Sequence, residues 1–304
     1  MSKKPLVSIL MNCFNGEEFL NQSLNSVINQ SYKNWELIFW DNKSTDKSIE
    51  IVTSYVDKRI KIFKNSLHTN LGKARKNAFL HAKGDYLAFL DVDDIWMKDK
   101  LYYQIKEFND SNIGISFTNS LYFSRKTKIN LYKNKKIFAL NTNSLIINYP
   151  LSLNSIMLDM KKIKQLDYDF DESFSNISDY DLIIRLSSIS KVKYLNKVLS
   201  GWRIHGSNQS FKKKELFNQE REKWCNFHLK NNYLDYYFDE IKEVKQLILA
   251  EKRIFNYGLK NFEDFDLSSI RNFRNRFFIF FSFIPFIPNL IYQIKDLLFK
   301  FRWY

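Results

Sequence analysis

The sequence has 304 residues, 45% hydrophobic and 26% charged, so the chain can bury a substantial core and is not expected to be disordered overall. The formal net charge of +14 favours an anionic partner, although charge alone does not distinguish nucleic acid, acidic lipid and phosphorylated substrates. The two cysteines, Cys13 and Cys225, exclude a disulfide framework and favour a reduced, cytoplasmic setting, and no signal peptide is expected.

The first 120 residues alternate between strand-like and helix-like patterns. Continuous apolar runs predict strands at 6–11, 35–40, 59–63, 85–90 and 113–118. Apolar residues at helical spacing, with helix-start signals, predict helices at 17–30, 44–52, 72–81 and 98–108. This alternation predicts an α/β fold, Rossmann-like, with a mostly parallel sheet flanked by helices. Ligand sites in such sheets lie at the carboxyl ends of strands.

The pattern is less regular beyond residue 120. A Lys- and Asn-rich stretch at 120–150 is interpreted as an excursion from the sheet, and further strands are expected at 151–158 and 192–199. A helix is expected from Asp179 to Ile189, because Leu182, Ile183 and Leu186 share one of its faces. Residues from 212 to about 260 read as a charged helical extension.

The last segment of the chain combines apolar and basic residues. Residues 277–292 carry no charge, but they contain Pro285 and Pro288 and are shorter than the roughly 20 residues of a membrane-spanning helix. Basic residues beside an apolar face, with terminal aromatics, predict that about 271–304 lie in the membrane interface. The alternative is a pair of helices that closes the core of the main domain.

Three carboxylates, those of Asp91, Asp93 and Asp94, directly follow the fourth expected strand. Close carboxylates repel one another, and a bound divalent cation removes this repulsion. Oxygen ligands favour a hard ion such as Mg²⁺ or Mn²⁺, which can neutralise a diphosphate leaving group. Such a motif alone is more often a solvated turn than a metal site. Polar residues after two other strands, at 12–15 and at Asp41, favour a site.

The order of these motifs resembles glycosyltransferase family 2, the inverting enzymes of the GT-A fold. The resemblance covers about residues 5–210. The matching segments are Asn12-Cys13-Phe14-Asn15, Asp41 to Asp46, Asn70-Leu71-Gly72, Lys76-Asn77, Gly84 to Asp94, Phe170-Asp171-Glu172, Asp179 to Leu186 and Arg203-Ile204-His205. The resemblance implies a GT-A catalytic domain at 1–211, with a nucleotide-sugar half at about 1–120 and an acceptor half at about 121–211. A helical extension would follow at 212–304.

The resemblance also implies roles for individual residues. Nucleotide-sugar binding falls to Cys13, Phe14, Asn15, Asp41, Lys76, Asp91 and Val92. Asp41 would accept a hydrogen bond from the nucleobase, expected to be uracil. Asp93 would be the direct ligand of Mn²⁺ or Mg²⁺, with Asp91 and His205 completing the metal site. Asp179 is expected to be the general base that takes the proton from the acceptor hydroxyl.

Several positions depart from the family pattern. Asn42-Lys43 stands where the family has Asp-Gly, and Ser178 replaces a Glu before the expected base. Lys76 stands where the family has Arg, and the neighbouring Arg75 could compensate. Asp181 is expected to support its loop, with Arg185 four residues later as a possible partner.

These features together predict an inverting, metal-dependent hexosyl- or N-acetylhexosaminyl-transferase. It would move a sugar from a UDP-sugar to a glycan or lipid-linked acceptor in surface polysaccharide, lipooligosaccharide or glycoprotein glycan synthesis. It is expected to be cytoplasmic and peripheral on the inner face of the cell membrane. One alternative is a basic nucleic-acid-binding protein, for which the sequence holds no recognised motif. Another is an inactive GT-A scaffold in a membrane-bound assembly, which the retained candidate site residues disfavour.

Overall fold

The computed structural model describes residues 4–124, 128–131, 140–206, 208, 213–231 and 233–256. The chain divides into two compact units. The first consists of Met1–Asn141 with Pro150–Asn208, and the second of Thr142–Tyr149 with Gln209–Tyr304. Residues 142–149, which the sequence alone groups with the catalytic domain, thus belong with the C-terminal helices. The membrane-interface segment expected at about 271–304 lies outside the described residues.

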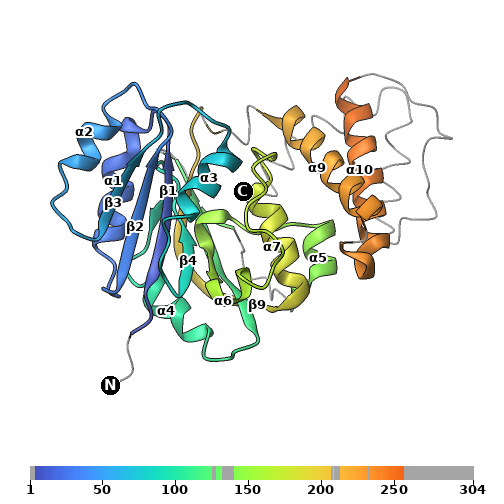
Figure 1. Cartoon of the computed structure of the whole chain (residues 1–304), viewed down its shortest axis with the longest axis horizontal. Coiled ribbons are helices and arrows are strands. Elements are labelled where there is room, and N and C mark those ends of the chain that lie inside the picture. The colour runs from blue at the N-terminus through green and yellow to red at the C-terminus, as the bar shows by residue number, and fades with distance from the viewer. Residues whose placement is uncertain are drawn as a thin grey trace. The chain divides into compact units, whose positions relative to one another are not determined.

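In the described part of the first unit, nine strands form one sheet in the order β3-β2-β1-β4-β8-β6-β9-β5, with β7 paired to β6 (Figure 1). The strands are β1 Val7–Cys13, β2 Trp35–Asp41, β3 Ile60–Lys64, β4 Tyr86–Phe89, β5 Ile95–Trp96, β6 Ile113–Phe123, β7 Lys128–Asn130, β8 Ile156–Asp159 and β9 Lys191–Arg203. Strands β3, β2, β1 and β4 are parallel, whereas β8 runs antiparallel to both β4 and β6. The predicted α/β fold is confirmed, with a parallel N-terminal part and a mixed remainder.

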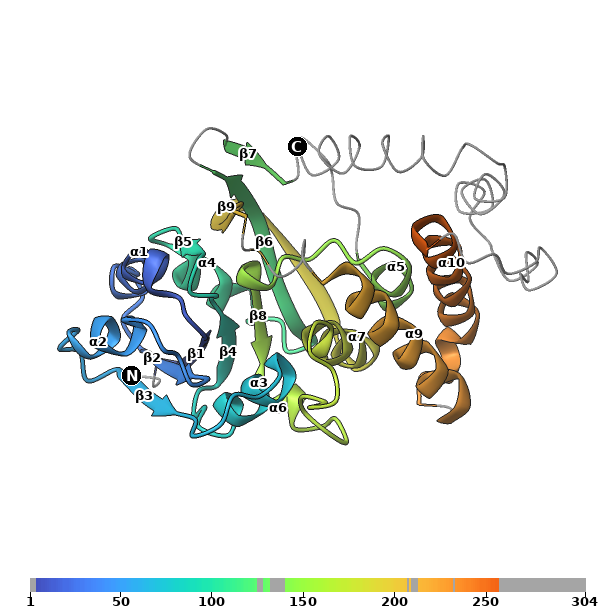
Figure 2. The same cartoon turned by 90° about the horizontal axis from the view of Figure 1, so that it is seen from above.

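Helices of the first unit cover both faces of the sheet. They are α1 Glu17–Ile28, α2 Ser48–Thr53, α3 Leu71–Phe79, α4 Lys100–Glu107, α6 Met160–Ile163 and α7 Ser178–Ile189, with the short 3-10 turn η1 Leu153–Ser155. Figure 2 shows α1 and α4 on one face, and α3 and α7 on the other. Alternation along β1 explains this, because Val7, Ile9 and Met11 pack with Leu20 and Leu24 of α1 in the main core.

Two strands differ from the lengths expected from the sequence. Strand β9 continues beyond residue 199 to Arg203 and pairs in parallel with β6, with irregular register along the pair. The extension was not expected, because Ser200 and Gly201 interrupt the apolar pattern of the strand. The strand expected at 151–158 begins only at Ile156, because Asn154 and Ser155 form a buried turn whose polar side chains are hydrogen-bonded.

The second unit is helical in its described part. Its elements are α5 Thr142–Ile147, α9 Lys214–Asn231, η2 Asp235–Tyr237 and α10 Phe238–Asn256. Helix α10 packs against both α5 and α9. Its buried residues include Ile241, Val244 and Ile248, and Trp224 of α9 is fully buried. The helical extension expected after residue 212 is confirmed as far as α10, and no helix among the described residues has the length and apolarity to cross a membrane.

Candidate active site

The carboxyl ends of β1, β2 and β4 meet at one edge of the sheet. These three strands are parallel neighbours, and the register places Cys13 of β1 beside Asp41 of β2. The loop after β4 carries Asp91 at the same edge. Polar groups that are distant in sequence are therefore brought together by strand pairing, as expected for a parallel sheet.

The loops after β1 and β2 are fastened to each other. Asn15 has a left-handed backbone (φ 54°), and its side-chain oxygen accepts a hydrogen bond from the Thr45 N–H (2.8 Å). The Asn15 N–H donates to Ser44 Oγ (3.0 Å), while the Ser44 N–H donates to the Asp41 carboxylate (3.2 Å to Oδ2). Lys43, where the family has Gly, is also left-handed (φ 68°). Asp41 is thus held in a buried, fixed orientation.

Asn42, which replaces the second acid of the family pattern, fastens the loop before α3. Its side chain donates to the Thr69 carbonyl (2.7 Å) and accepts from the Thr69 N–H (3.2 Å). Nδ1 of His68 lies 3.0 Å from the Asn42 carbonyl oxygen, and the His68 ring lies against Phe14, with 4.1 Å between ring centroids. Phe14 keeps 48% of its surface exposed. Sequence reasoning missed His68, because a single histidine in a polar loop carries no signal of its own.

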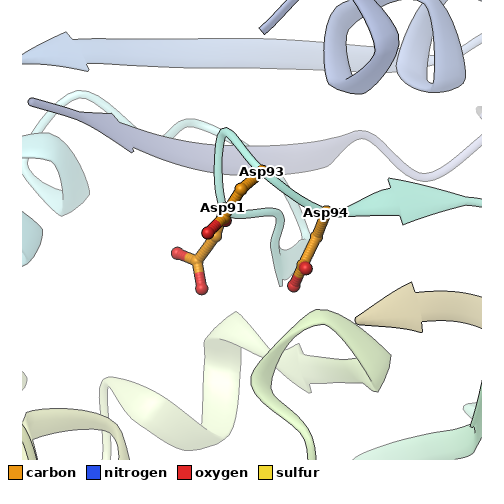
Figure 3. Close-up of side chains that lie close together, drawn as sticks. All are labelled: Asp91, Asp93 and Asp94. Atoms are coloured by element: carbon orange, nitrogen blue, oxygen red, sulfur yellow. The ribbon is translucent and has the colours of Figure 1, made fainter. Parts of the chain in front are cut away.

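The three carboxylates Asp91, Asp93 and Asp94 lie on the loop between β4 and β5 (Figure 3). They offer ligand atoms that all lie within 4.8 Å of one another. Asp94 is already engaged, because Asn154 Nδ2 donates to its Oδ2 (2.7 Å) and the Arg203 N–H donates to its Oδ1 (2.9 Å). It therefore ties the loop to η1 and β9. Burial, and then the charges of Asp93 and Asp91, raise the pKa of Asp94 well above its ordinary value.

Asp91 has three charged neighbours, one positive and two negative. Burial is the main cause that raises the pKa of its carboxyl to about 6. The positive charge of Arg75 lowers this pKa, whereas the negative charges of Asp93 and Asp179 raise it. The carboxylates of the cluster thus repel one another when they are charged, and a cation bound between them would relieve this repulsion.

His205 lies near the C-terminal end of the first unit in sequence, and its side chain contacts the acidic loop. Its Nε2 lies 2.9 Å from Asp93 Oδ2, although the two residues are 112 positions apart. Arg203 holds this arrangement, since its Nε donates to the Asp93 carbonyl (2.8 Å) and its Nη2 to Gln22 of α1 (2.6 Å). The side chain of Asn208 accepts from the His205 N–H (2.7 Å). The structure thus brings together two of the residues expected to hold a metal, Asp93 and His205, beside the third, Asp91.

Asp179 lies in the first turn of α7 and is 15% exposed. Its Oδ1 accepts a hydrogen bond from Arg75 Nη1 (2.9 Å), which also donates to Ser178 Oγ (3.0 Å). Lys76 stands where the family motif has arginine, but the guanidinium that donates to Asp179 belongs to Arg75. Lys76 itself is half-buried on α3.

The start of α3 is locked against the loop that precedes α7. Asn70 caps the helix by accepting from the Lys73 N–H (2.8 Å), and its Nδ2 donates to the Glu172 carbonyl (3.0 Å). A Cβ added at Gly72 would lie 1.8 Å from the Phe174 carbonyl oxygen, so only glycine allows this approach. The Asn-x-Gly motif therefore sets the position of Arg75, one helical turn further along α3.

Replacing Gly72 with alanine is expected to lower the free energy of unfolding by about 2 kcal/mol, because the new methyl group displaces backbone rather than a flexible side chain. Chemical denaturation monitored by circular dichroism measures this change. Gly206→Ala is the matched control, since no atom lies within 4 Å of its added Cβ, and its stability should stay within about 0.5 kcal/mol of the wild type. A stable Gly72→Ala protein would contradict the tight approach.

Asp181 and Arg185 form a buried ion pair that supports the loop before α7. Arg185 donates to Asp181 Oδ2 from Nε (3.0 Å) and Nη2 (2.6 Å). The same guanidinium donates to the Tyr168 and Asp169 carbonyls, both at 2.6 Å. The pairing expected at four-residue spacing is confirmed, and it fixes the chain that leads to Asp179.

Comparison with solved structures supports the fold. The chain superposes on S. aureus TarS 1-349 in complex with UDP-GlcNAc with a TM-score of 0.67 and 18% identity, covering 85% of this chain and 77% of that chain. It also superposes on the mannosyltransferase PcManGT from Pyrobaculum calidifontis, in complex with GDP-Man and Mn²⁺, with a TM-score of 0.62 and 12% identity. That match covers 97% of this chain and 88% of PcManGT. At these identities the likeness establishes the GT-A fold alone.

Comparison of sequences establishes the family. The chain is 30% identical over 217 residues to the Escherichia coli UDP-Glc:alpha-D-GlcNAc-diphosphoundecaprenol beta-1,3-glucosyltransferase WfgD, covering 70% of this chain and 83% of that protein. The model of the family "Glycosyl transferase family 2" matches residues 8–165. These are the residues that build the parallel strands, their polar carboxyl ends and the acidic loop. The chain belongs to glycosyltransferase family 2.

Proposed function

We propose that the protein transfers a sugar, with inversion, from a UDP-sugar to a glycan or lipid-linked acceptor in the synthesis of a surface polysaccharide. The observation that carries this proposal is the meeting of Asp93 and His205 beside Asp91, at the sheet edge that also holds Asp41. A site with acidic, imidazole and nucleobase-facing groups at one edge suits a nucleoside diphosphate bound through a cation.

The nucleotide would lie over the ends of β1 and β2. Asp41 is buried and fixed by the Ser44 N–H, so its carboxylate can accept the N3–H of uracil with little loss of side-chain freedom. The exposed face of Phe14 offers a surface on which the base can pack. The remaining donor-binding candidates are Cys13, Asn15, Lys76, Asp91 and Val92.

The residues present fit a divalent metal ion. Asp94 is fully buried and held through both of its oxygens, so we propose Asp91, Asp93 and His205 as the donor set. Two carboxylates and one imidazole suit Mn²⁺ or Mg²⁺, and the imidazole favours Mn²⁺. When bound, the ion neutralises the diphosphate so that it can depart as the leaving group.

Asp179 is the proposed general base. It lies at the start of α7, where its carboxylate is oriented by Arg75 and is 15% exposed, so an acceptor hydroxyl can reach it. Its role is to take the proton of the acceptor hydroxyl as that oxygen attacks the anomeric carbon. The buried Asp181–Arg185 pair keeps the helix start in place during this step.

The relatives suggest the substrates. WfgD is named for UDP-glucose and a diphosphoundecaprenol-linked acceptor, and TarS binds UDP-GlcNAc in its crystal structure. We therefore propose UDP-glucose and UDP-GlcNAc as the first donors to test, with a polyprenyl-diphosphate-linked sugar as acceptor. A lipid-linked acceptor agrees with a location on the inner face of the cell membrane, with about 271–304 as the membrane-binding segment.

A donor screen tests the proposal. The protein is incubated with Mn²⁺ and each of a panel of UDP-sugars, with and without a polyprenyl-diphosphate-linked acceptor, and UDP release is measured. One or a few UDP-sugars should give acceptor-dependent UDP release that EDTA abolishes. A folded protein that releases UDP from none of them, and whose thermal stability no UDP-sugar raises, would exclude the proposed activity. A protein that binds UDP-sugar without turnover with these acceptors would instead indicate a different acceptor or an inactive scaffold.

A further inference from the structure

We propose that Arg75 is a positioning residue that orients the candidate base Asp179. This inference rests on the proposed function, in which Asp179 takes the acceptor proton. Arg75 would thus act on the acceptor side of the site. The family resemblance, by contrast, implies a donor-binding role for the neighbouring Lys76.

The first argument is the hydrogen-bond geometry. Arg75 is 6% exposed, and its Nη1 donates to Asp179 Oδ1 (2.9 Å) and to Ser178 Oγ (3.0 Å). Both acceptors lie in the first turn of α7, so one nitrogen of α3 fixes the start of the helix and the rotamer of the carboxylate. Because Oδ1 is engaged, Oδ2 is the oxygen that takes the acceptor proton. A general base held by a third group in this way is a recurring feature of enzyme sites.

The second argument is electrostatic. Arg75 and Asp179 form an ion pair whose side chains are only 7% and 15% exposed, so water screens their attraction little. The guanidinium therefore holds the Asp179 carboxylate by charge as well as by hydrogen bonding. Lysine is a poor replacement here, because its compact ammonium on a flexible stem lacks the planar, multi-donor geometry of a guanidinium.

The third argument is the rigidity of the platform that carries Arg75. The Asn70 cap and the close approach of Gly72 to the Phe174 carbonyl lock α3 to the loop before α7. The distance from the Arg75 backbone to the start of α7 is thereby set by backbone packing. Serine at position 178, where the family has Glu, supplies the second acceptor that Arg75 uses.

The test compares Arg75→Gln with Lys73→Gln, an exposed residue on the same helix. With Mn²⁺ and the active UDP-sugar, Arg75→Gln should lower kcat about 100-fold, as expected when a base is misplaced. Its affinity for Mn²⁺ and UDP, measured by calorimetry, should stay equal or become tighter, because a positive charge near the metal ligands is removed. A parallel loss of kcat and of UDP affinity would show a merely structural role and overturn the inference. Lys73→Gln should match the wild type in both measurements.

Two further measurements test the inference, and the first of them does not use Arg75→Gln. First, free guanidinium, at concentrations below those that unfold the protein, should raise the kcat of Arg75→Ala at least tenfold. No increase in kcat would count against the inference. Second, Arg75→Gln should reduce the residual turnover of Asp179→Asn less than about twofold, because Arg75 acts through Asp179, whereas additive losses would overturn it. A wild-type protein inactive with every UDP-sugar would overturn the proposed function, whereas an active wild type with an equally active Arg75→Gln would overturn this inference alone.

Discussion

Replacing Asp93 with alanine is expected to lower metal-dependent turnover about a thousandfold, because a bound cation supplies several kcal/mol of charge stabilisation to a departing diphosphate. Asp93 is the carboxylate that faces His205, and 27% of its side chain remains exposed to a ligand. Its backbone carbonyl still accepts the Arg203 hydrogen bond in the variant, so the loop should keep its shape. Calorimetric titration with Mn²⁺ and UDP should show that their coupled binding is lost.

The control for this substitution is Asp110→Ala, which removes an exposed carboxylate from the turn after α4. It should bind Mn²⁺ and UDP as the wild type does, because the lost charge is remote from the sheet edge that carries the site. If Asp93→Ala kept the metal dependence of the wild type, the cation would have to be held elsewhere. Asp94→Ala should differ from both, with lowered stability, because it removes the carboxylate that accepts hydrogen bonds from Asn154 and from the Arg203 N–H.

Replacing Asp179 with asparagine is expected to lower kcat by about 10³-fold while the affinity for UDP and Mn²⁺ changes little, because general base catalysis typically contributes 10²- to 10⁴-fold. Asparagine keeps an oxygen that can accept the hydrogen bond from Arg75, so the geometry at the start of α7 should survive. The substitution therefore removes the proton acceptor without removing the contact. Initial rates at saturating donor, together with calorimetric affinities, separate the two effects.

The control for Asp179→Asn is Asp167→Asn, an exposed carboxylate on the chain that leads to α7. It should retain wild-type kcat and wild-type affinities. Slow hydrolysis of the UDP-sugar by water should also fall in Asp179→Asn if the same carboxylate activates water. An Asp179→Asn protein with nearly normal kcat would assign the base to another residue.

The sheet edge of the site was predictable from local patterns. The apolar runs of β1, β2 and β4 are buried and end in polar residues, so the positions of Asp41 and Asp91 follow from strand boundaries and parallel pairing. The approach of Asp93 to His205 was predictable only through the family resemblance. No local pattern connects two residues that lie 112 positions apart.

Other parts of the site depend on tertiary contacts that the sequence does not display. Adjacent residues on a helix point about 100° apart, so whether Arg75 or Lys76 faces α7 is decided by the packing of α3. Asp93 and Asp94 are chemically identical in the sequence. Only the hydrogen bonds from Asn154 and the Arg203 N–H show that Asp94 anchors the loop, whereas Asp93 stays half-buried and faces His205. The extension of β9 to Arg203 was hidden because Ser200 and Gly201 interrupt its apolar pattern, although both residues pair with β6.

The anchoring of Asp94 has a consequence for how the protein is made. Its two oxygens bind groups from η1 and from the end of β9, so the acidic loop is completed by segments that leave the ribosome 60 and 109 residues after it. The four parallel strands can pair long before these segments have been synthesised, whereas contacts between distant segments form late in folding. A nascent chain therefore carries the parallel half of the sheet well before the hydrogen bonds that anchor Asp94 can form.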